Sequence, residues 1–221
     1  MVEAVIFDMD GLLVRSEQYW KSGEQQILKR YGVQMTPEKI LEATGLGTDD
    51  AFEFWYRLKP WPDFNPKALK KELFEYVKER FREDGEMMPG AKYILEFFNN
   101  RGIKMALASG APAEIIDVVI DKTGIRKYFK IISTAHDEEY NKPHPAVYIT
   151  TAKKLNVNPV NCLVFEDSFN GLLAAKSARM KTVCIPDPQF YNFKGFVIAD
   201  LVLGSLNDFN DNHFAFLNNL K

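Results

Sequence analysis

Two aspartates, Asp8 and Asp10, stand two positions apart and are followed at once by Gly11. They come directly after the apolar residues 5–7, which predict a buried strand. Ligands of open parallel sheets bind beyond the carboxyl ends of the strands, so this pair lies where a site is expected. One aspartate there could merely cap the next helix, but two close carboxylates repel each other until a cation or a proton relieves the repulsion. Mg²⁺ suits such hard oxygen ligands.

A second acidic pair, Glu166 and Asp167, follows the apolar residues 162–165 and precedes Ser168. Taken alone, this pair is typical of the acidic first turn of a helix. Together with Asp8 and Asp10 it predicts that four acids, each following a strand, converge at one edge of a sheet.

A hydroxyl and a lysine add two further signals. Ser109 ends the apolar run of residues 105–108, and Gly110 and a predicted helix follow it, so the hydroxyl and free N–H groups could hold a phosphate. A plain helix cap is the alternative for Ser109. Lys142 lies in a loop before the helix expected from Pro143, and most such lysines are solvated.

Short apolar runs alternate with stretches of helical length along most of the chain. This alternation, with strands that are apolar on both faces, predicts a doubly wound α/β core with a parallel sheet. The strands are expected over residues 2–7, 103–108, 130–134, 162–165 and 181–185. The helices are expected over about residues 90–100, 112–122, 143–155 and 168–178.

The alternation is interrupted between residues 15 and 86, where the sequence reads as helical throughout. One helix is expected from Ser16 to Tyr31, a second from Thr36-Pro37 and a third from Asn65-Pro66. We therefore predict a core domain of residues 1–14 and 87–221 and an inserted all-helical domain of residues 15–86.

Composition narrows the classes of partner. The 221 residues are 46 % hydrophobic, which is enough for a globular core, and their net charge of −2 gives no basic excess for nucleic acid. The apolar runs are far shorter than the roughly 20 residues that span a bilayer, and no secretory leader is recognised, so a cytoplasmic protein is expected. Cys162 and Cys184 read as small buried hydrophobes.

Four segments, taken in order, resemble the motifs of the haloacid dehalogenase superfamily of phosphotransferases. They are IFDMDGLLVRSE (residues 6–17), Ser109, NKPHPAVY (residues 141–148) and VFEDSFNG (residues 164–171). With a helical insertion straight after the first, they are similar to the sugar-phosphatase and β-phosphoglucomutase branch, above all to hexitol and 2-deoxyglucose-6-phosphate phosphatases. The resemblance implies a Rossmann-like core with a helical cap domain.

The resemblance also implies a role for each matched residue. Asp8 would be the nucleophile that forms an aspartyl-phosphate, and Asp10 the acid and base. Mg²⁺ would be held by Asp8, the backbone carbonyl of Asp10 and Asp167, with Glu166 as a further ligand or a neighbour of the ligands. The phosphate would be bound by Asp8, Met9, Asp10, Ser109, Gly110 and Lys142.

The inserted domain is similar to the family's cap, which excludes water and contacts the alcohol half of the substrate. Candidates for that surface are the loop of residues 44–47 and Glu17, Trp20, Trp55 and Arg57, although such residues are more often packing or solvated. Arg15 departs from relatives, which often carry an acid there.

The leading hypothesis is a Mg²⁺-dependent, monomeric phosphatase that hydrolyses small phosphorylated sugars or polyols. A sugar phosphomutase of the β-phosphoglucomutase kind is one alternative, and a receiver-type signalling module that holds phosphoaspartate is another. Receivers are about half this length and place the acceptor after a middle strand. The sequence does not name the sugar, and the tail after about Ser205, rich in Asn and Phe, predicts no role.

Overall fold

The computed structural model describes residues 1–43 and 47–220. It divides into two compact units. The core unit comprises Met1–Arg15 and Glu86–Lys221, and the helical unit comprises Ser16–Gly85.

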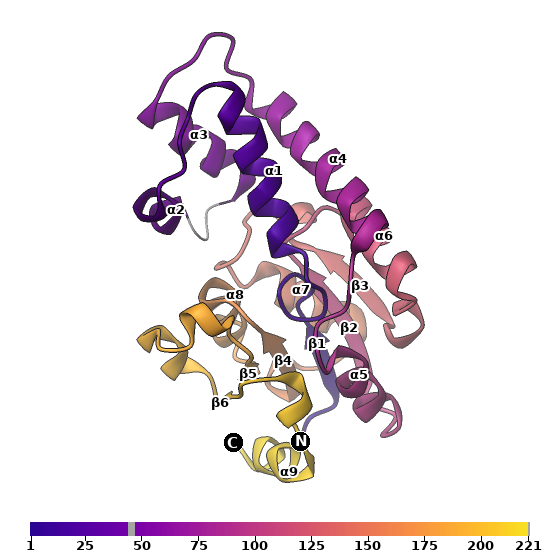
Figure 1. The fold of residues 1–221 in the computed structure, drawn as a ribbon. Coiled ribbons are helices and arrows are strands. Elements are labelled where there is room, and N and C mark those ends of the chain that lie inside the picture. Colours follow the sequence, from indigo (N-terminus) through magenta and orange to yellow (C-terminus); the bar gives the residue numbers. More distant parts are fainter. Residues whose placement is uncertain (44–46, 221) are drawn as a thin grey trace. The chain divides into compact units, whose positions relative to one another are not determined.

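The core unit is built on a six-stranded sheet in the order β3-β2-β1-β4-β5-β6 (Figure 1). Every paired neighbour in it runs parallel. The strands are β1 (Ala4–Phe7), β2 (Lys104–Ser109), β3 (Ile131–Thr134), β4 (Cys162–Glu166), β5 (Lys181–Cys184) and β6 (Leu201–Val202). The predicted doubly wound α/β fold is confirmed, and β6 is an addition that the sequence did not indicate.

Five helices of the core unit join and cover these strands. They are α5 (Ala91–Asn99), α6 (Ala113–Thr123), α7 (Ala146–Leu155), α8 (Phe169–Ser177) and α9 (Asp211–Asn219). Helix α7 packs on β1, β2 and β3, while α8 packs on β4 and β5 and touches α7. Alternate strand residues such as Ile6, Ala106 and Val164 face these two helices and are fully buried.

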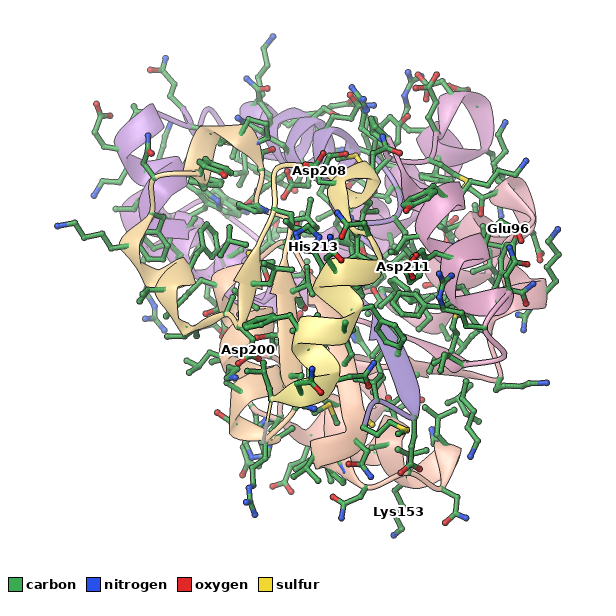
Figure 2. All side chains as sticks on the ribbon, turned by 90° about the horizontal axis from the view of Figure 1, so that it is seen from below. Glu96, Lys153, Asp200, Asp208, Asp211 and His213 are labelled. Atoms are coloured by element: carbon green, nitrogen blue, oxygen red, sulfur yellow. The ribbon has the colours of Figure 1, made fainter. Side chains whose placement is uncertain are left out.

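The other strand residues meet a cluster of aromatic rings. The Phe7 ring lies 5.1 Å from that of Phe165 and 6.1 Å from that of Phe98 on α5. Phe209, which precedes α9, lies 5.1 Å from Phe165. Figure 2 shows α9 from below, with Asp211 at its start. Asp211 pairs with Arg101 at 2.6 Å. The tail that the sequence left without a role therefore closes the aromatic side of the core.

The sheet has its switch point between β1 and β4. The connections from β1 lead to one side of the sheet through β2 and β3, and β4 begins the other side. The backbone N–H of Asp8 donates to the carbonyl of Phe165 at 3.0 Å, so the two strands stay paired to their carboxyl ends. Ligands of such sheets bind in the crevice at this point.

The helical unit consists of α1 (Glu17–Arg30), α2 (Pro37–Ala43), α3 (Thr48–Leu58) and α4 (Pro66–Asp84) in the described ranges. Helices α1 and α4 approach closely because Gly23 has no side chain; a Cβ there would lie 2.7 Å from Leu73 and from Tyr76. Asn65 caps α4 by accepting the Ala68 N–H at 3.1 Å. Among the described residues, every helix is too short or too polar to cross a membrane.

Candidate active site

Three carboxylates meet where β1 and β4 end. Asp8, Glu166 and Asp167 each offer an oxygen, and these oxygens all lie within 4.8 Å of one another. The Glu166 side chain is fully buried and that of Asp8 nearly so, while Asp167 is half-buried. Three residues that the sequence predicted at one site are thus brought together by neighbouring parallel strands.

Lys142 provides the positive charge at this cluster. Its ammonium group donates to Asp8 Oδ1 at 2.6 Å, to Glu166 Oε1 at 2.7 Å and to the carbonyl of Ala108 at 3.1 Å. The Lys142 side chain is only 10 % exposed, so this lysine is not the solvated surface residue that its loop position alone would suggest.

The Glu166 carboxylate accepts five hydrogen bonds. Oε1 accepts from Lys142 and from the Tyr148 hydroxyl at 2.6 Å. Oε2 accepts from the backbone N–H groups of Asp167 and Ser168 at 3.1 and 3.2 Å, and from the Ser168 hydroxyl at 3.0 Å. Glu166 is therefore held on both sides, by α7 and by the turn that starts α8.

Burial and charge set the ionisation of the site. Burial raises the pKa of Asp8 to about 8; Lys142 opposes this rise, and Glu166 and Asp10 add to it. Burial would also raise the pKa of Glu166, but Lys142 and the bonds from Tyr148 and Ser168 outweigh it and hold that pKa below its usual value. Lys142 thus keeps Glu166 ionised but does not fully offset the rise that burial causes in the pKa of Asp8. A further cation would therefore favour the charged form of Asp8.

Ser109 and Asp10 form a second contact beside the cluster. The Ser109 hydroxyl donates to Asp10 Oδ2 at 3.1 Å and accepts the Ala111 N–H at 2.9 Å, and Ser109 is fully buried. Asp10 does not contribute a carboxylate to the three-acid group found among the described residues. The Ser109 hydroxyl, at the end of β2, therefore orients the Asp10 carboxyl.

The two remaining predicted phosphate-binding positions lie in the backbone next to these side chains. Met9 is fully buried between Asp8 and Asp10. Gly110 follows β2, and a Cβ there would meet only Asn141 Oδ1, at 3.9 Å. The position that a Gly110 side chain would take is therefore open space.

The donor set fits Mg²⁺. Magnesium prefers carboxylate and carbonyl oxygens at about 2.0–2.1 Å and binds through one or two carboxylates while it keeps other positions for water and phosphate. Asp8 and Asp167 offer such oxygens within the 4.8 Å group. Soft ligands are absent from this group of described residues, which disfavours ions that select sulfur.

The tryptophans proposed for the substrate surface make contacts within the helical unit. Trp55 is fully buried and donates to Glu24 Oε1 at 2.6 Å. Trp20 is half-buried and lies edge-on to Phe74, with ring centroids 5.9 Å apart. Burial raises the pKa of Glu24 above its usual value, although the bond from Trp55 opposes this rise.

The other candidates on the insertion are solvated or undescribed. Arg57 is exposed and pairs with Glu53 at 3.0 Å, and Glu17 is exposed. Arg15, which departs from relatives, is the last residue of the core unit's first segment and is exposed as well. Of the loop expected to contact substrate, residues 44–46 lie outside the described residues.

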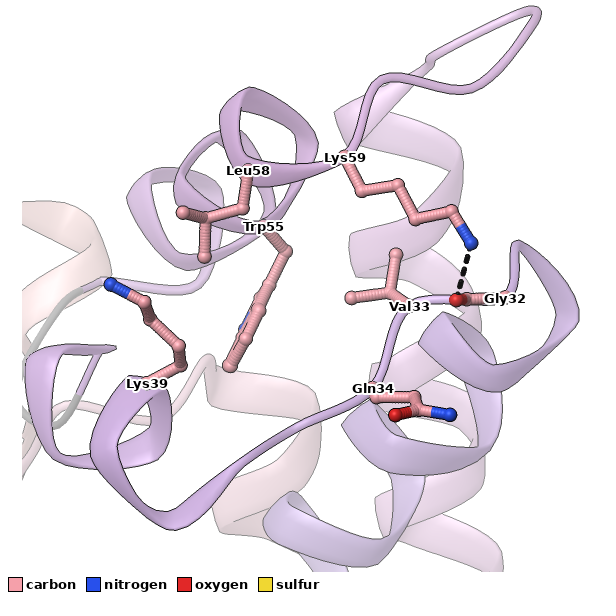
Figure 3. A pocket seen from close by; sticks show the side chains of 7 residues that line it. All are labelled: Gly32, Val33, Gln34, Lys39, Trp55, Leu58 and Lys59. Carbon is pink, nitrogen blue, oxygen red and sulfur yellow. Dashed lines mark hydrogen bonds between the residues drawn. The ribbon is translucent and has the colours of Figure 1, made fainter.

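One hollow lies wholly within the helical unit. Figure 3 shows the Lys59 ammonium donating to the carbonyl of Gly32, at 2.5 Å, on one side of this hollow. The hollow has a volume of about 430 Å³ and is lined by Gly32, Val33, Gln34, Lys39, Trp55, Leu58 and Lys59. None of these residues belongs to the acidic cluster.

Tyr148 is the contributor to the site that sequence reasoning missed. It lies on the buried face of α7 and is fully buried, so by pattern it reads as a core aromatic. Only its place six residues after Lys142, in the segment NKPHPAVY, associates it with the site.

Comparison with known families gives a match over most of the chain. The profile of the family described as haloacid dehalogenase-like hydrolase matches residues 5–185. Hexitol phosphatase B of Escherichia coli (strain K12) is 34 % identical over 206 residues, which cover 93 % of each chain. The phosphorylated carbohydrates phosphatase of Thermotoga maritima is 30 % identical over 182 residues, covering 82 % of this chain and 84 % of that protein.

The fold of this chain is also similar to solved structures. A β-phosphoglucomutase from Clostridium difficile superposes with a TM-score of 0.84 at 25 % identity, covering 99 % of this chain and 98 % of that one. CbbY from Rhodobacter sphaeroides in complex with phosphate also has a TM-score of 0.84, at 24 % identity.

Proposed function

The chain belongs to the haloacid dehalogenase-like hydrolases, and from this premise we propose that it is a Mg²⁺-dependent phosphatase of small phosphorylated sugars or polyols. One observation carries the proposal: the Asp8 carboxylate lies at the sheet's switch point, 2.6 Å from a buried lysine and within the group formed with Glu166 and Asp167. This arrangement supports a carboxylate nucleophile beside the Lys142 ammonium and beside a Mg²⁺ ion that the acids would hold.

The proposed substrate class rests on the relatives. Proteins 34 % and 30 % identical over most of this chain carry the names hexitol phosphatase and phosphorylated carbohydrates phosphatase. A phosphorylated polyol or sugar is therefore the first class to assay. Family membership among hydrolases also disfavours the receiver-type module that the sequence left open.

Asp8 acts first in the proposed reaction. A carboxylate oxygen of Asp8 attacks phosphorus, the bond from phosphorus to the alcohol oxygen breaks, and an aspartyl-phosphate forms. Lys142, which already lies 2.6 Å from Asp8, places a positive charge beside the incoming phosphoryl oxygens and so reduces the repulsion between two anions.

Asp10 moves the protons. It gives a proton to the leaving alkoxide, and the resulting carboxylate then takes a proton from the water that attacks the aspartyl-phosphate. Inorganic phosphate leaves and Asp8 is restored. The Ser109 hydroxyl, 3.1 Å from Asp10 Oδ2, restricts the positions that this carboxyl can take.

The carboxylates of Asp8 and Asp167, with the backbone carbonyl of Asp10, would hold Mg²⁺. When bound, this ion supplies charge neutralisation that favours the ionised form of Asp8 and the developing charge on the phosphoryl group. The helical unit, inserted between Arg15 and Glu86, would serve as the cap that limits water and selects the alcohol.

The test is phosphate release from a panel of sugar and polyol phosphates, with and without Mg²⁺, by the wild type, Asp8→Asn and Asp117→Asn. Asp117 is an exposed aspartate that pairs with Arg126 on the surface, so its variant controls for the loss of one carboxylate. Asp8→Asn should abolish release while Asp117→Asn keeps it. Release that survives Asp8→Asn contradicts the proposed nucleophile.

A phosphomutase is the second candidate, favoured by the superposition on a β-phosphoglucomutase with a TM-score of 0.84. In that reaction the phosphoenzyme returns its phosphoryl group to a sugar hydroxyl instead of to water. A coupled assay for conversion of a sugar 1-phosphate into the 6-phosphate distinguishes the two reactions. Conversion faster than phosphate release would favour the mutase.

A further inference from the structure

Tyr148 lies at the site without reaching the acids that would touch substrate. Its hydroxyl donates to Glu166 Oε1 at 2.6 Å, and the Lys142 ammonium lies 4.9 Å from the centroid of its ring. The ring is fully buried on α7, which packs on β1, β2 and β3. Tyr148 thus contacts both partners of the ion pair between Lys142 and Glu166, one through its hydroxyl and one through its ring.

The hydrogen bonds of Glu166 decide what this carboxylate can do. A carboxylate has about four lone-pair sites on its two oxygens. Glu166 already accepts five hydrogen bonds, from Lys142 and Tyr148 on one oxygen and from Asp167 and the Ser168 N–H and hydroxyl on the other. No lone pair of Glu166 is therefore left to bind a metal ion. Its role at the site is instead its ion pair with Lys142.

Gly171 leaves room for the same carboxylate on α8. A Cβ at Gly171 would lie 1.8 Å from Glu166 Oε1 and 2.0 Å from Glu166 Cδ. The Gly171 N–H also donates to the Ser168 hydroxyl, which in turn donates to Glu166 Oε2. The Glu166 carboxylate therefore occupies a space that α8 leaves free and that the Tyr148 hydroxyl closes.

We propose that Tyr148 is a positioning residue of this site: with Gly171 it fixes Glu166, and Glu166 in turn holds Lys142 against Asp8 to receive a phosphoryl group. This role rests on the proposed phosphatase function, because Lys142 needs an anion to bind. Glu166 acts through Lys142 and leaves the metal oxygens to Asp8 and Asp167.

Tyr148→Phe tests the role because it removes only the hydroxyl and keeps the ring. The matched control is Tyr128→Phe, since the Tyr128 hydroxyl also donates to a carboxylate of the core unit, that of Glu96. Tyr128 precedes β3 and so lies at the amino ends of the strands, away from the acidic cluster. A loss of stability alone would affect both variants.

The readout is the dissociation constant of inorganic phosphate, measured by calorimetry with Mg²⁺ present, which does not depend on turnover. Tyr148→Phe should weaken phosphate binding about tenfold, the scale of one hydrogen bond to a charged group, while Tyr128→Phe stays within about twofold of the wild type. Gly171→Ala, whose Cβ would lie 1.8 Å from Glu166 Oε1 and must displace that carboxylate, should weaken binding at least as much and provides the test if Tyr148→Phe does not fold.

Two results would distinguish a failure of the positioning role of Tyr148 from a failure of the proposed phosphatase function. Wild-type protein that binds no phosphate contradicts the proposed function itself. Wild-type binding with Tyr148→Phe unchanged, or with Gly171→Ala unchanged while circular dichroism shows it folded, overturns the positioning role and leaves the proposed function standing.

Discussion

Replacing Lys142 by methionine is the perturbation whose effect the structure predicts most sharply. The substitution keeps an unbranched side chain but removes a charge that donates to Asp8, Glu166 and the carbonyl of Ala108. It would leave two buried carboxylates without a cation. Breaking a buried ion pair from one side costs about 3–5 kcal/mol, a large share of the roughly 5–15 kcal/mol that stabilises a domain.

The matched control is Lys176→Met. Lys176 also pairs with an acid of the core unit, Asp200, at 2.8 Å, but its side chain is 33 % exposed. A partly exposed pair contributes about 0–1 kcal/mol, so this variant should lose little stability. The difference between the two variants isolates the effect of burying uncompensated charge.

The assay is urea unfolding of both variants without Mg²⁺, followed by far-UV circular dichroism. Tryptophan fluorescence serves as a second probe, because Trp20, Trp55 and Trp61 all lie in the helical unit and report that unit. With a slope of about 2 kcal/mol/M, a loss of about 4 kcal/mol lowers the midpoint of the core unit by about 2 M.

Adding Mg²⁺ sharpens the prediction. Mg²⁺ should raise the free energy of unfolding of Lys142→Met more than that of the wild type. The reason is that in the variant the ion replaces the positive charge that Lys142 places beside Asp8 and Glu166. Lys142→Met that loses no more than Lys176→Met, or that gains nothing from Mg²⁺, would refute the electrostatic account of the site.

Three further outcomes follow from the same structure. Asp10→Asn should lose turnover of sugar phosphates. With p-nitrophenyl phosphate, whose leaving group needs no proton, it should still release a burst of about one equivalent of p-nitrophenolate in rapid-mixing experiments. Steady release without a burst would contradict the two roles of Asp10. Chelation by EDTA should abolish phosphate release and added Mg²⁺ should restore it; activity that persists in EDTA would contradict the metal requirement. Glu24→Gln should stabilise the helical unit at pH 7, since burial raises the pKa of Glu24 and penalises its charged form, and the gain should vanish below its ordinary pKa of 4.5. Thermal unfolding followed by tryptophan fluorescence at pH 4 and pH 7 measures this gain, and a gain equal at both pH values would rule out the charge as its cause.

Sequence patterns predicted the core sheet because its strands are apolar on both faces, and three of them end at a polar signal. Asp8, Ser109 and Glu166 all stand at strand ends, and parallel pairing brings such ends to one edge whatever the loops between them. Helix α7 begins later than predicted, at Ala146 instead of near Pro143, and the backbone N–H of His144 donates to the carbonyl of Asn141 in the turn before it.

The remaining features depend on tertiary contacts that no local pattern encodes. β6 has two half-buried residues, too few to show a periodicity. Tyr148 reads as core because its ring is fully buried, and its contacts with Glu166 and Lys142 come from distant parts of the fold. Trp55 is fully buried against Glu24, a partner 31 positions away in sequence, which agrees with packing as the commoner role of such candidates.

The most direct test of the account is the identity of the phosphorylated residue. Acid-quenched enzyme, caught during turnover of a sugar phosphate, can be reduced with borohydride, which converts an aspartyl-phosphate into homoserine, and then digested for mass spectrometry. The account predicts homoserine at position 8 and nowhere else in the chain. Modification at another acid, or turnover with an unmodified peptide containing Asp8 at every quench time, would contradict it.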